Sequence, residues 1–185
     1  MAKETPQETV VLGITASVAA YRVCDLILEL REKGIGVIPV LSKDAHHFVT
    51  PLLVQSLAGH EVYQDLFSLP GRVKPVHIEL AREADCIVVA PASADVIARM
   101  SLGLADDLLT CVVLAAACPL IVAPAMNDKM YENPLTQEHL GRLRKRGALI
   151  IEPVVGKLVC SDRALGHIAP NDVILRHILS TLKKK

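Results

Sequence analysis

The sequence predicts an α/β fold of three layers, in which a parallel sheet is flanked by helices. Apolar residues make up 51% of the 185 residues, but only 3% are aromatic and Trp is absent. The core must therefore consist of Val, Ile, Leu and Ala, as in parallel strands covered by helices. Short β-branched runs alternate with longer segments of helical spacing. No linker or repeat interrupts this alternation, which predicts a single domain over residues 1–185 with a flexible start at 1–8.

The first strands and helices are marked by β-branched runs and by glycine. Thr9–Ile14 is predicted to be a strand, and residues 18–33 carry apolar side chains at helical spacing until Gly34 ends the helix. Gly36–Leu41 predicts the second strand, and a helix over about 46–57 follows it.

The rest of the chain continues the alternation. The predicted elements are a helix from Pro75 to 84, a strand at 86–90, one or two helices within 93–117, a strand at 119–123, a helix at 136–146, a strand at 149–151 and a helix at Asn171–Leu182. Asn171 is expected to be the N-cap of the last helix. Strands connected by helices of this length form right-handed βαβ units, so the strands should run parallel.

Charge and cysteine content exclude several classes of function. Lys and Arg number 20 and Asp and Glu also number 20, which gives no field to attract nucleic acid or an anionic membrane. No run of about 18 apolar residues predicts a membrane span, and the polar start predicts no signal peptide. Five cysteines without a Cys-x-x-Cys pair argue against a disulfide framework and predict a reducing, cytoplasmic compartment.

Small and hydroxyl residues follow the first three predicted strands. They are Thr15, Ser17 and Val18 after the first strand, Ser42 after the second, and Ser93, Ala94 and Asp95 after the third. Ligands bind at the carboxyl ends of parallel strands, where hydroxyls and the N–H groups of a helix start can hold a phosphate. Neither dinucleotide nor Mg-ATP is indicated, because both glycine-rich phosphate motifs are absent. The pattern predicts a flat, phosphorylated ligand, although each hydroxyl alone could simply cap a helix.

Asn127 follows the predicted strand at 119–123 and so lies just beyond a carboxyl end. Its side chain offers one acceptor and two donors, which suit a substrate amide or carboxylate. Position alone leaves open that Asn127 only caps the following helix.

Six motifs, in one order and at one spacing, carry a resemblance to a known family. They are Thr15-Ala-Ser-Val-Ala-Ala-Tyr21, His77-Ile-Glu-Leu-Ala-Arg-Glu-Ala-Asp85, Pro91-Ala-Ser-Ala-Asp95, Gly103-Leu-Ala-Asp-Asp-Leu-Leu-Thr110, Pro124-Ala-Met-Asn127 with Met130, and Gly156-Lys-Leu-Val-Cys160. The chain resembles the homo-oligomeric flavin-containing cysteine decarboxylases over about residues 10–169, and within them the phosphopantothenoylcysteine decarboxylases of coenzyme A synthesis. The resemblance implies a Rossmann-like, flavodoxin-like fold and FMN as the cofactor.

The resemblance also implies roles for individual residues. His77 would be the active-site histidine, Asn127 and Met130 would bind the substrate, and Cys160 would protonate the product from a substrate flap at about 155–169. The residues expected around FMN are Thr15, Ser17, Val18, Ser42, Ser93, Ala94, Asp95 and Ala125. Without the resemblance, His77 would be an ordinary surface or cap histidine and Cys160 an incidental thiol.

The implied reaction is the decarboxylation of 4'-phosphopantothenoylcysteine to 4'-phosphopantetheine. Loss of CO₂ from a cysteinyl carboxylate needs an electron sink that no side chain provides, so a cofactor must supply it. In the family, FMN oxidises the cysteine side chain before CO₂ leaves, and the reduced flavin then returns the electrons.

Several positions depart from the family pattern. Ala16 replaces a common glycine, Asp95 replaces an asparagine, Asp106-Asp107 is doubly acidic, and the flap after Cys160 lacks two glycines. The alternatives are a peptidyl-cysteine decarboxylase, a flavin prenyltransferase, or a non-catalytic flavin-binding regulatory subunit.

The expected partners are a small phosphorylated cysteine conjugate and further copies of the same chain, with neither nucleic acid nor membrane. Family members bind FMN at the subunit contacts of a trimer. Residues 97–117 offer more apolar surface than one helix face of a monomer needs, which predicts a homotrimer or a multiple of three.

Overall fold

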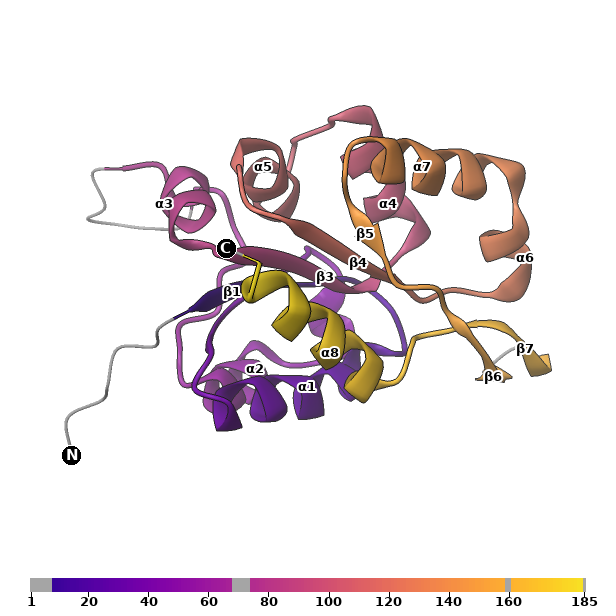
Figure 1. Cartoon of the computed structure of the whole chain (residues 1–185), viewed down its shortest axis with the longest axis horizontal. Helices are drawn as coiled ribbons and strands as arrows, with labels where there is room; N and C mark the ends of the chain where they lie inside the picture. Colours follow the sequence, from indigo (N-terminus) through magenta and orange to yellow (C-terminus); the bar gives the residue numbers. More distant parts are fainter. Residues whose placement is uncertain (1–7, 68–73, 159–160, 185) are drawn as a thin grey trace.

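A computed structural model describes residues 8–67, 74–158 and 161–184. Its centre is a five-stranded sheet with the strand order β2-β1-β3-β4-β5, in which every pairing is parallel (Figure 1). The strands are β1 (Thr9–Ile14), β2 (Gly36–Leu41), β3 (Cys86–Ala92), β4 (Leu120–Pro124) and β5 (Leu149–Ile150). The predicted α/β fold is confirmed, and β1 and β2 have the predicted bounds.

Helices cover both faces of the sheet. They are α1 (Ala20–Glu32), α2 (Pro51–Ala58), α3 (Val76–Glu83), α4 (Ala94–Leu102), α5 (Leu108–Ala115), α6 (Asp128–Glu132), α7 (Pro134–Lys145) and α8 (Asn171–Leu182). Helices α1, α2 and α8 pack on one face, and α3, α4, α5 and α7 pack on the other (Figure 1). These are the expected three layers.

Strand β1 shows why the protein has two hydrophobic cores, one on each face of the sheet. Val10, Leu12 and Ile14 face α1 and α8, whereas Val11 faces α3 and α5, because successive side chains of a strand point to opposite faces. All four side chains are essentially fully buried. Burial of each aliphatic side chain stabilises the fold by about 1.5–3 kcal/mol, so aliphatic strands alone can hold both helical layers.

Caps account for most differences between the predicted and observed helices. The helix expected over 46–57 is split into a short 3₁₀ turn at Ala45–His47 and α2. Thr50 starts α2, because its hydroxyl accepts a hydrogen bond from the Leu53 N–H (3.2 Å) and Pro51 follows as the first helical residue.

The predicted N-cap of the last helix is wrong. Pro170 holds the N-cap position of α8, and Asn171 is already helical. The Asn171 side chain instead donates a hydrogen bond to the Arg22 carbonyl oxygen (2.9 Å), which fastens α8 to α1. The Asn171 side chain therefore makes a long-range hydrogen bond, whereas the local sequence predicts that it caps the helix.

Residues 154–158 and 161–167 form an antiparallel pair of strands, here called the hairpin, outside the main sheet, and the sequence did not predict these strands. It consists of β6 (Val154–Leu158) and β7 (Ser161–His167) and lies beside α6 at the right of Figure 1. Strands β1, β3 and β4 run towards this side, so the hairpin and α6 flank the carboxyl ends of the sheet. No helix in the described part of the chain is long and apolar enough to cross a membrane.

Candidate active site

Thr15 joins the carboxyl ends of β1 and β3. It is fully buried, its hydroxyl donates to the Pro91 carbonyl oxygen (2.6 Å), and the Thr15 hydroxyl oxygen itself accepts from the Ser93 N–H (2.9 Å). Both bonds bind the chain to itself, so Thr15 holds the edge of the site in place. Its expected contact with the cofactor stays a prediction.

The start of α1 is open to an anion. Ser17 is half-buried and accepts a hydrogen bond from the Ala19 N–H (3.2 Å), while Val18 is exposed. Helix α1 has no side-chain cap bond and no acidic residue in its first turn. Because the first N–H groups of a helix lack intrahelical partners, this end can bind a phosphate.

The ends of β2 and β3 bring two further serines to the same edge. The Ser42 N–H donates to the Ile14 carbonyl oxygen (2.9 Å), which places Ser42 beside the end of β1. Its half-buried hydroxyl has no hydrogen-bond partner within the described residues. Ser93 caps α4 by accepting from the Val96 N–H (3.4 Å). The edge therefore gathers Thr15, Ser17, Ser42 and Ser93, as the sequence predicted.

Asp95 and the acidic pair after α4 surround one cation. Arg99 contacts Asp95 (3.0 Å), Asp106 (2.8 Å) and Asp107 (3.5 Å), and these carboxylates raise the pKa of the guanidinium. Asp107 also caps α5. Sequence reasoning missed Arg99, although its spacing of four from Asp95 is that of a helical ion pair.

Asn127 is both a cap and a potential ligand. Its side-chain oxygen accepts from the Lys129 N–H (2.9 Å) and so starts α6. Its amide NH₂ has no hydrogen-bond partner in the described part of the chain, which leaves two donors for a carboxylate or carbonyl. Met130 is half-exposed on the same short helix. Two further predicted site residues lie just after strands: Ala125, which is buried, follows β4, and Ala94, which is half-exposed, follows β3. Asn127 can therefore cap α6 with its oxygen and bind a ligand with its NH₂ group, so the two roles considered from the sequence are compatible.

The hairpin directly contacts residues 126–131, here called the Asn127 segment. The Met126 N–H donates to the Gly166 carbonyl oxygen (3.1 Å), and Glu152, just before β6, accepts a hydrogen bond from the Tyr131 hydroxyl of α6. Burial and the Glu152 carboxylate raise the pKa of Tyr131 to about 12. Sequence reasoning missed Gly166, Tyr131 and Glu152. Cys160 lies outside the described residues.

His77 is not brought together with Asn127 in one chain. It is the second residue of α3, which packs against α5. Figure 1 draws α3 at the left, where β1 begins, whereas α6 and the hairpin lie at the right. The His77 Nδ1 atom is buried and has no hydrogen-bond partner among the described residues. Buried polar atoms are normally paired, so this nitrogen requires an explanation from outside the described chain.

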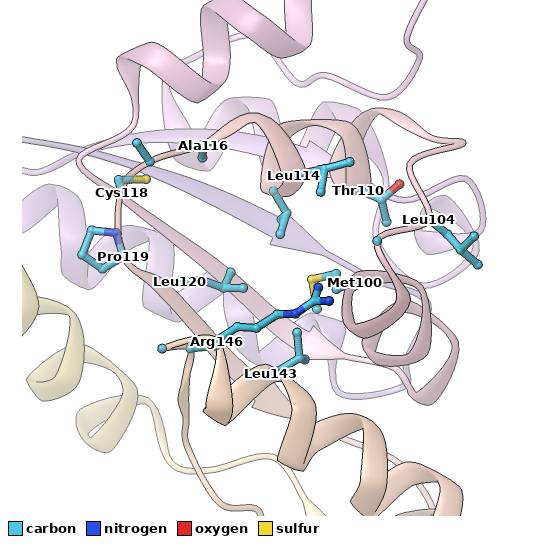
Figure 2. A pocket seen from close by; sticks show the side chains of 15 residues that line it. Met100, Leu104, Thr110, Leu114, Ala116, Cys118, Pro119, Leu120, Leu143 and Arg146 are labelled. Atoms are coloured by element: carbon cyan, nitrogen blue, oxygen red, sulfur yellow. The ribbon is translucent and has the colours of Figure 1, made fainter.

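A separate cavity of about 490 Å³ lies between α5, α7 and the start of β4. Apolar side chains such as Met100, Leu104, Leu114 and Leu120 line it, and Arg146 extends across it towards Met100 (Figure 2). None of the predicted site residues lines this cavity. Within the described residues there is no group of three or more side chains that could hold a metal ion.

Solved structures with the same fold include flavoproteins that act on cysteine. A mutant of PPC decarboxylase complexed with pantothenoylaminoethenethiol is 33% identical with a TM-score of 0.85, and the match covers 93% of this chain and 96% of that one. The FMN binding protein AtHal3 is 32% identical with a TM-score of 0.85, covering 97% and 98%. The FMN-dependent cysteine decarboxylase SpaF is 30% identical with a TM-score of 0.83, covering 97% of each chain.

Curated relatives and a family profile agree with these structures. The coenzyme A biosynthesis bifunctional protein CoaBC of Vibrio vulnificus strain YJ016 is 43% identical over 159 residues, which cover 86% of this chain and 40% of the relative. The CoaBC protein of Haemophilus influenzae is 40% identical over 176 residues, covering 95% and 44%. The chain thus spans less than half the length of these relatives. The profile described as Flavoprotein matches residues 1–183, and the chain belongs to the Flavoprotein family.

Proposed function

We propose that this chain catalyses the FMN-dependent decarboxylation of 4'-phosphopantothenoylcysteine to 4'-phosphopantetheine in coenzyme A biosynthesis. The observation that carries the proposal is the Asn127 amide, whose NH₂ has no partner among the described residues and lies beyond the end of β4. A buried or half-buried amide with two free donors suits a carboxylate. The CoaBC relatives and the PPC decarboxylase structure support the choice of substrate.

The edge formed by β1, β2 and β3 fits FMN. The hydroxyl of Ser42 and the uncapped start of α1 supply donors for a phosphate, and Ser17 and Ala94 are small enough to admit a flat ring. The acidic Asp95 would repel a phosphate, and its ion pair with Arg99, which also contacts Asp106 and Asp107, reduces this repulsion. When bound, FMN supplies the electron sink for decarboxylation.

The chain's own residues would then orient the substrate and move protons. The Asn127 NH₂ would donate hydrogen bonds to the cysteinyl carboxylate, and Met130 would cover the substrate on the exposed side of α6. His77 would take or share a proton of the substrate thiol. Cys160 remains the proposed proton donor that completes the product.

We also propose that the active chain is a homotrimer or a multiple of three. The separation of α3 from α6 supports this, because a second copy could supply His77 to the site of the first. Leu104 and Leu114 are 52% and 60% exposed beside the cavity of Figure 2, which supports an apolar contact between copies. A role in coenzyme A synthesis supports a cytoplasmic location, and the continuous alternation of strands and helices supports one flavoprotein domain.

Release of CO₂ from phosphopantothenoylcysteine by the FMN-loaded protein tests the proposed activity. A peptide with a C-terminal cysteine serves as the matched substrate, because a peptidyl-cysteine decarboxylase is the first alternative that the sequence left open. We expect turnover of phosphopantothenoylcysteine and little of the peptide. The opposite preference, or no CO₂ from either, would overturn the proposal.

Mixed oligomers test the shared site. His77→Asn and Asn127→Asp variants should each be inactive with flavin bound, whereas coexpressed chains should regain part of the activity if a site uses residues of two copies. Activity absent from every mixture, although the mixed oligomers form, would mean that His77 and Asn127 act within one chain or not at all.

A further inference from the structure

Two contacts hold the base of the hairpin against the segment that carries Asn127. One contact comes from β7, and the other comes from the residue that leads into β6. Both involve described residues at the base of the hairpin. Asn127 lies between their two attachment points, Met126 and Tyr131.

The contact from β7 is a backbone hydrogen bond. The Met126 N–H donates to the Gly166 carbonyl oxygen (3.1 Å). Gly166 has a φ of +137°, and a Cβ at this position would overlap the Met126 carbonyl oxygen. Only glycine therefore permits this approach without strain.

The contact from the start of β6 is a charged bridge. One carboxylate oxygen of Glu152 accepts from the Tyr131 hydroxyl and the other pairs with Arg144 of α7. Tyr131 is only 6% exposed, so its end of the bridge is shielded from water. Hydrogen bonds to a carboxylate are roughly twice as strong as neutral ones. The Tyr131 hydroxyl, whose pKa is raised to about 12 by burial and by Glu152, remains protonated and therefore a donor to the carboxylate.

Helix α6 cannot fix Asn127 without such support. It has five residues, and a helix of this length is unstable alone. The Tyr131 N–H donates to the Asn127 carbonyl oxygen (2.9 Å), so the turn transmits the position of Tyr131 to Asn127. Whatever holds the Tyr131 ring therefore holds the Asn127 backbone.

We propose that Glu152 is a positioning residue for Asn127, which it holds in place by binding Tyr131 to the base of the β6–β7 hairpin. Asn127 and the hairpin base then move as one unit. The consequence for substrate binding rests on the proposed function. The physical coupling between the hairpin base and α6 does not.

Amide hydrogen exchange of the FMN-loaded protein tests the coupling. Glu152→Gln and Tyr131→Phe each weaken the same bridge, and Glu138→Gln is the control because Glu138 forms a comparable exposed ion pair with Arg142 within α7 (2.6 Å). In both bridge variants we expect exchange about tenfold faster in 126–132 and also in 154–156 and 164–167. The control should match the wild type in all three segments.

A double variant adds a second criterion. If one bridge is responsible, Glu152→Gln with Tyr131→Phe should exchange no faster than Glu152→Gln alone, because the Tyr131 hydroxyl then has no carboxylate left to bind; Tyr131→Phe alone still leaves Glu152 paired with Arg144. Unchanged exchange in both single variants, or faster exchange at the hairpin with α6 unchanged, would overturn the coupling.

Kinetics connect the coupling to the substrate. We expect the KM for phosphopantothenoylcysteine to rise about tenfold in Glu152→Gln, with bound FMN unchanged and kcat reduced less. Glu152→Asp cannot span the same distance and should not rescue. A wild-type KM in a variant with faster exchange would overturn the positioning role. A wild type without decarboxylase activity would refute the proposed function while leaving the exchange result intact.

Discussion

The two sides of the strand-end edge are held in place by different kinds of contact. On the side of β1 and β3, the buried Thr15 hydroxyl binds Pro91 and Ser93 within the sheet. On the side of β4, the Asn127 segment is held from outside the sheet by Gly166 and Glu152. The first side consists of neutral bonds, one buried and one part-buried, at the ends of neighbouring strands. The second depends on a hairpin, a five-residue helix and a partly exposed carboxylate.

This difference separates the expected cofactor side from the expected substrate side. Bonds inside a parallel sheet open only when the sheet itself unfolds, whereas a hairpin and a short helix can shift by local opening. A rigid cradle suits a cofactor that stays bound. A more easily displaced segment suits a substrate that must enter and a product that must leave in every turnover.

The largest effect is expected from Asn127→Asp on the substrate side. The aspartate still caps α6, but it sets a negative charge against the substrate carboxylate, so kcat/KM should fall at least a hundredfold, about 3 kcal/mol. Asn133→Asp is the control, because Asn133 caps α7 in the same way and carries no proposed role. Steady-state CO₂ release gives both values. Equal activity in the two variants would show that Asn127 is only a cap.

Gly166→Ala should break the substrate side while leaving the cofactor side intact. Overlap with the Met126 carbonyl oxygen and a strained φ should cost about 1–3 kcal/mol and displace the hairpin, with FMN content unchanged. Gly141→Ala is the matched control, because a Cβ on this α7 glycine meets no atom within 4 Å. It should be neutral or stabilising by up to about 1 kcal/mol. Urea unfolding and flavin absorbance measure both; loss of FMN from Gly166→Ala would contradict the separation.

Thr15→Val should weaken the cofactor side through the fold. It leaves the half-buried Ser93 N–H without its acceptor, which should cost about 1–3 kcal/mol of unfolding free energy. Thr15→Ser keeps the hydroxyl and should recover much of this loss.

Ser42→Ala should leave the unfolding free energy within about 0.5 kcal/mol of the wild type but weaken FMN binding. Urea unfolding with FMN titration decides; a Ser42→Ala variant with normal FMN affinity would remove Ser42 from the cofactor site.

The last effect is absent at neutral pH and is expected only at alkaline pH. The folded pKa of Tyr131, about 12, lies above its ordinary value of 10.0. Between these values the unfolded chain loses the phenolic proton and the folded chain keeps it, so the contribution of Tyr131 is complete below pH 10 and is lost as pH rises to 12. Unfolding free energies from pH 8 to 12 should therefore fall more steeply for the wild type than for Tyr131→Phe. Parallel curves would mean that Tyr131 does not retain its proton in the fold.

The strand ends show how far sequence could predict the site. Thr15, Ser17, Ser42 and Ser93 were found because each follows a β-branched run, and parallel strands bring their carboxyl ends together. Two of the six motifs that carried the family resemblance, at 15–21 and 91–95, lie at these turns. For Asp95 and Asp106, the sequence showed only that they depart from the family pattern. It did not show that Arg99 binds both carboxylates.

The sequence by itself determined the layered α/β fold, since aliphatic strands can be buried only between helices. It also determined which turns gather at one edge. Only the tertiary structure decided that the Thr15 hydroxyl is consumed within the sheet, that Asn171 fastens two helices, and that Glu152 reaches Tyr131. Each of these contacts joins residues 21 or more positions apart. Local propensity and periodicity describe neighbours along the chain, so the partner of a polar side chain becomes defined only when packing brings distant segments into contact.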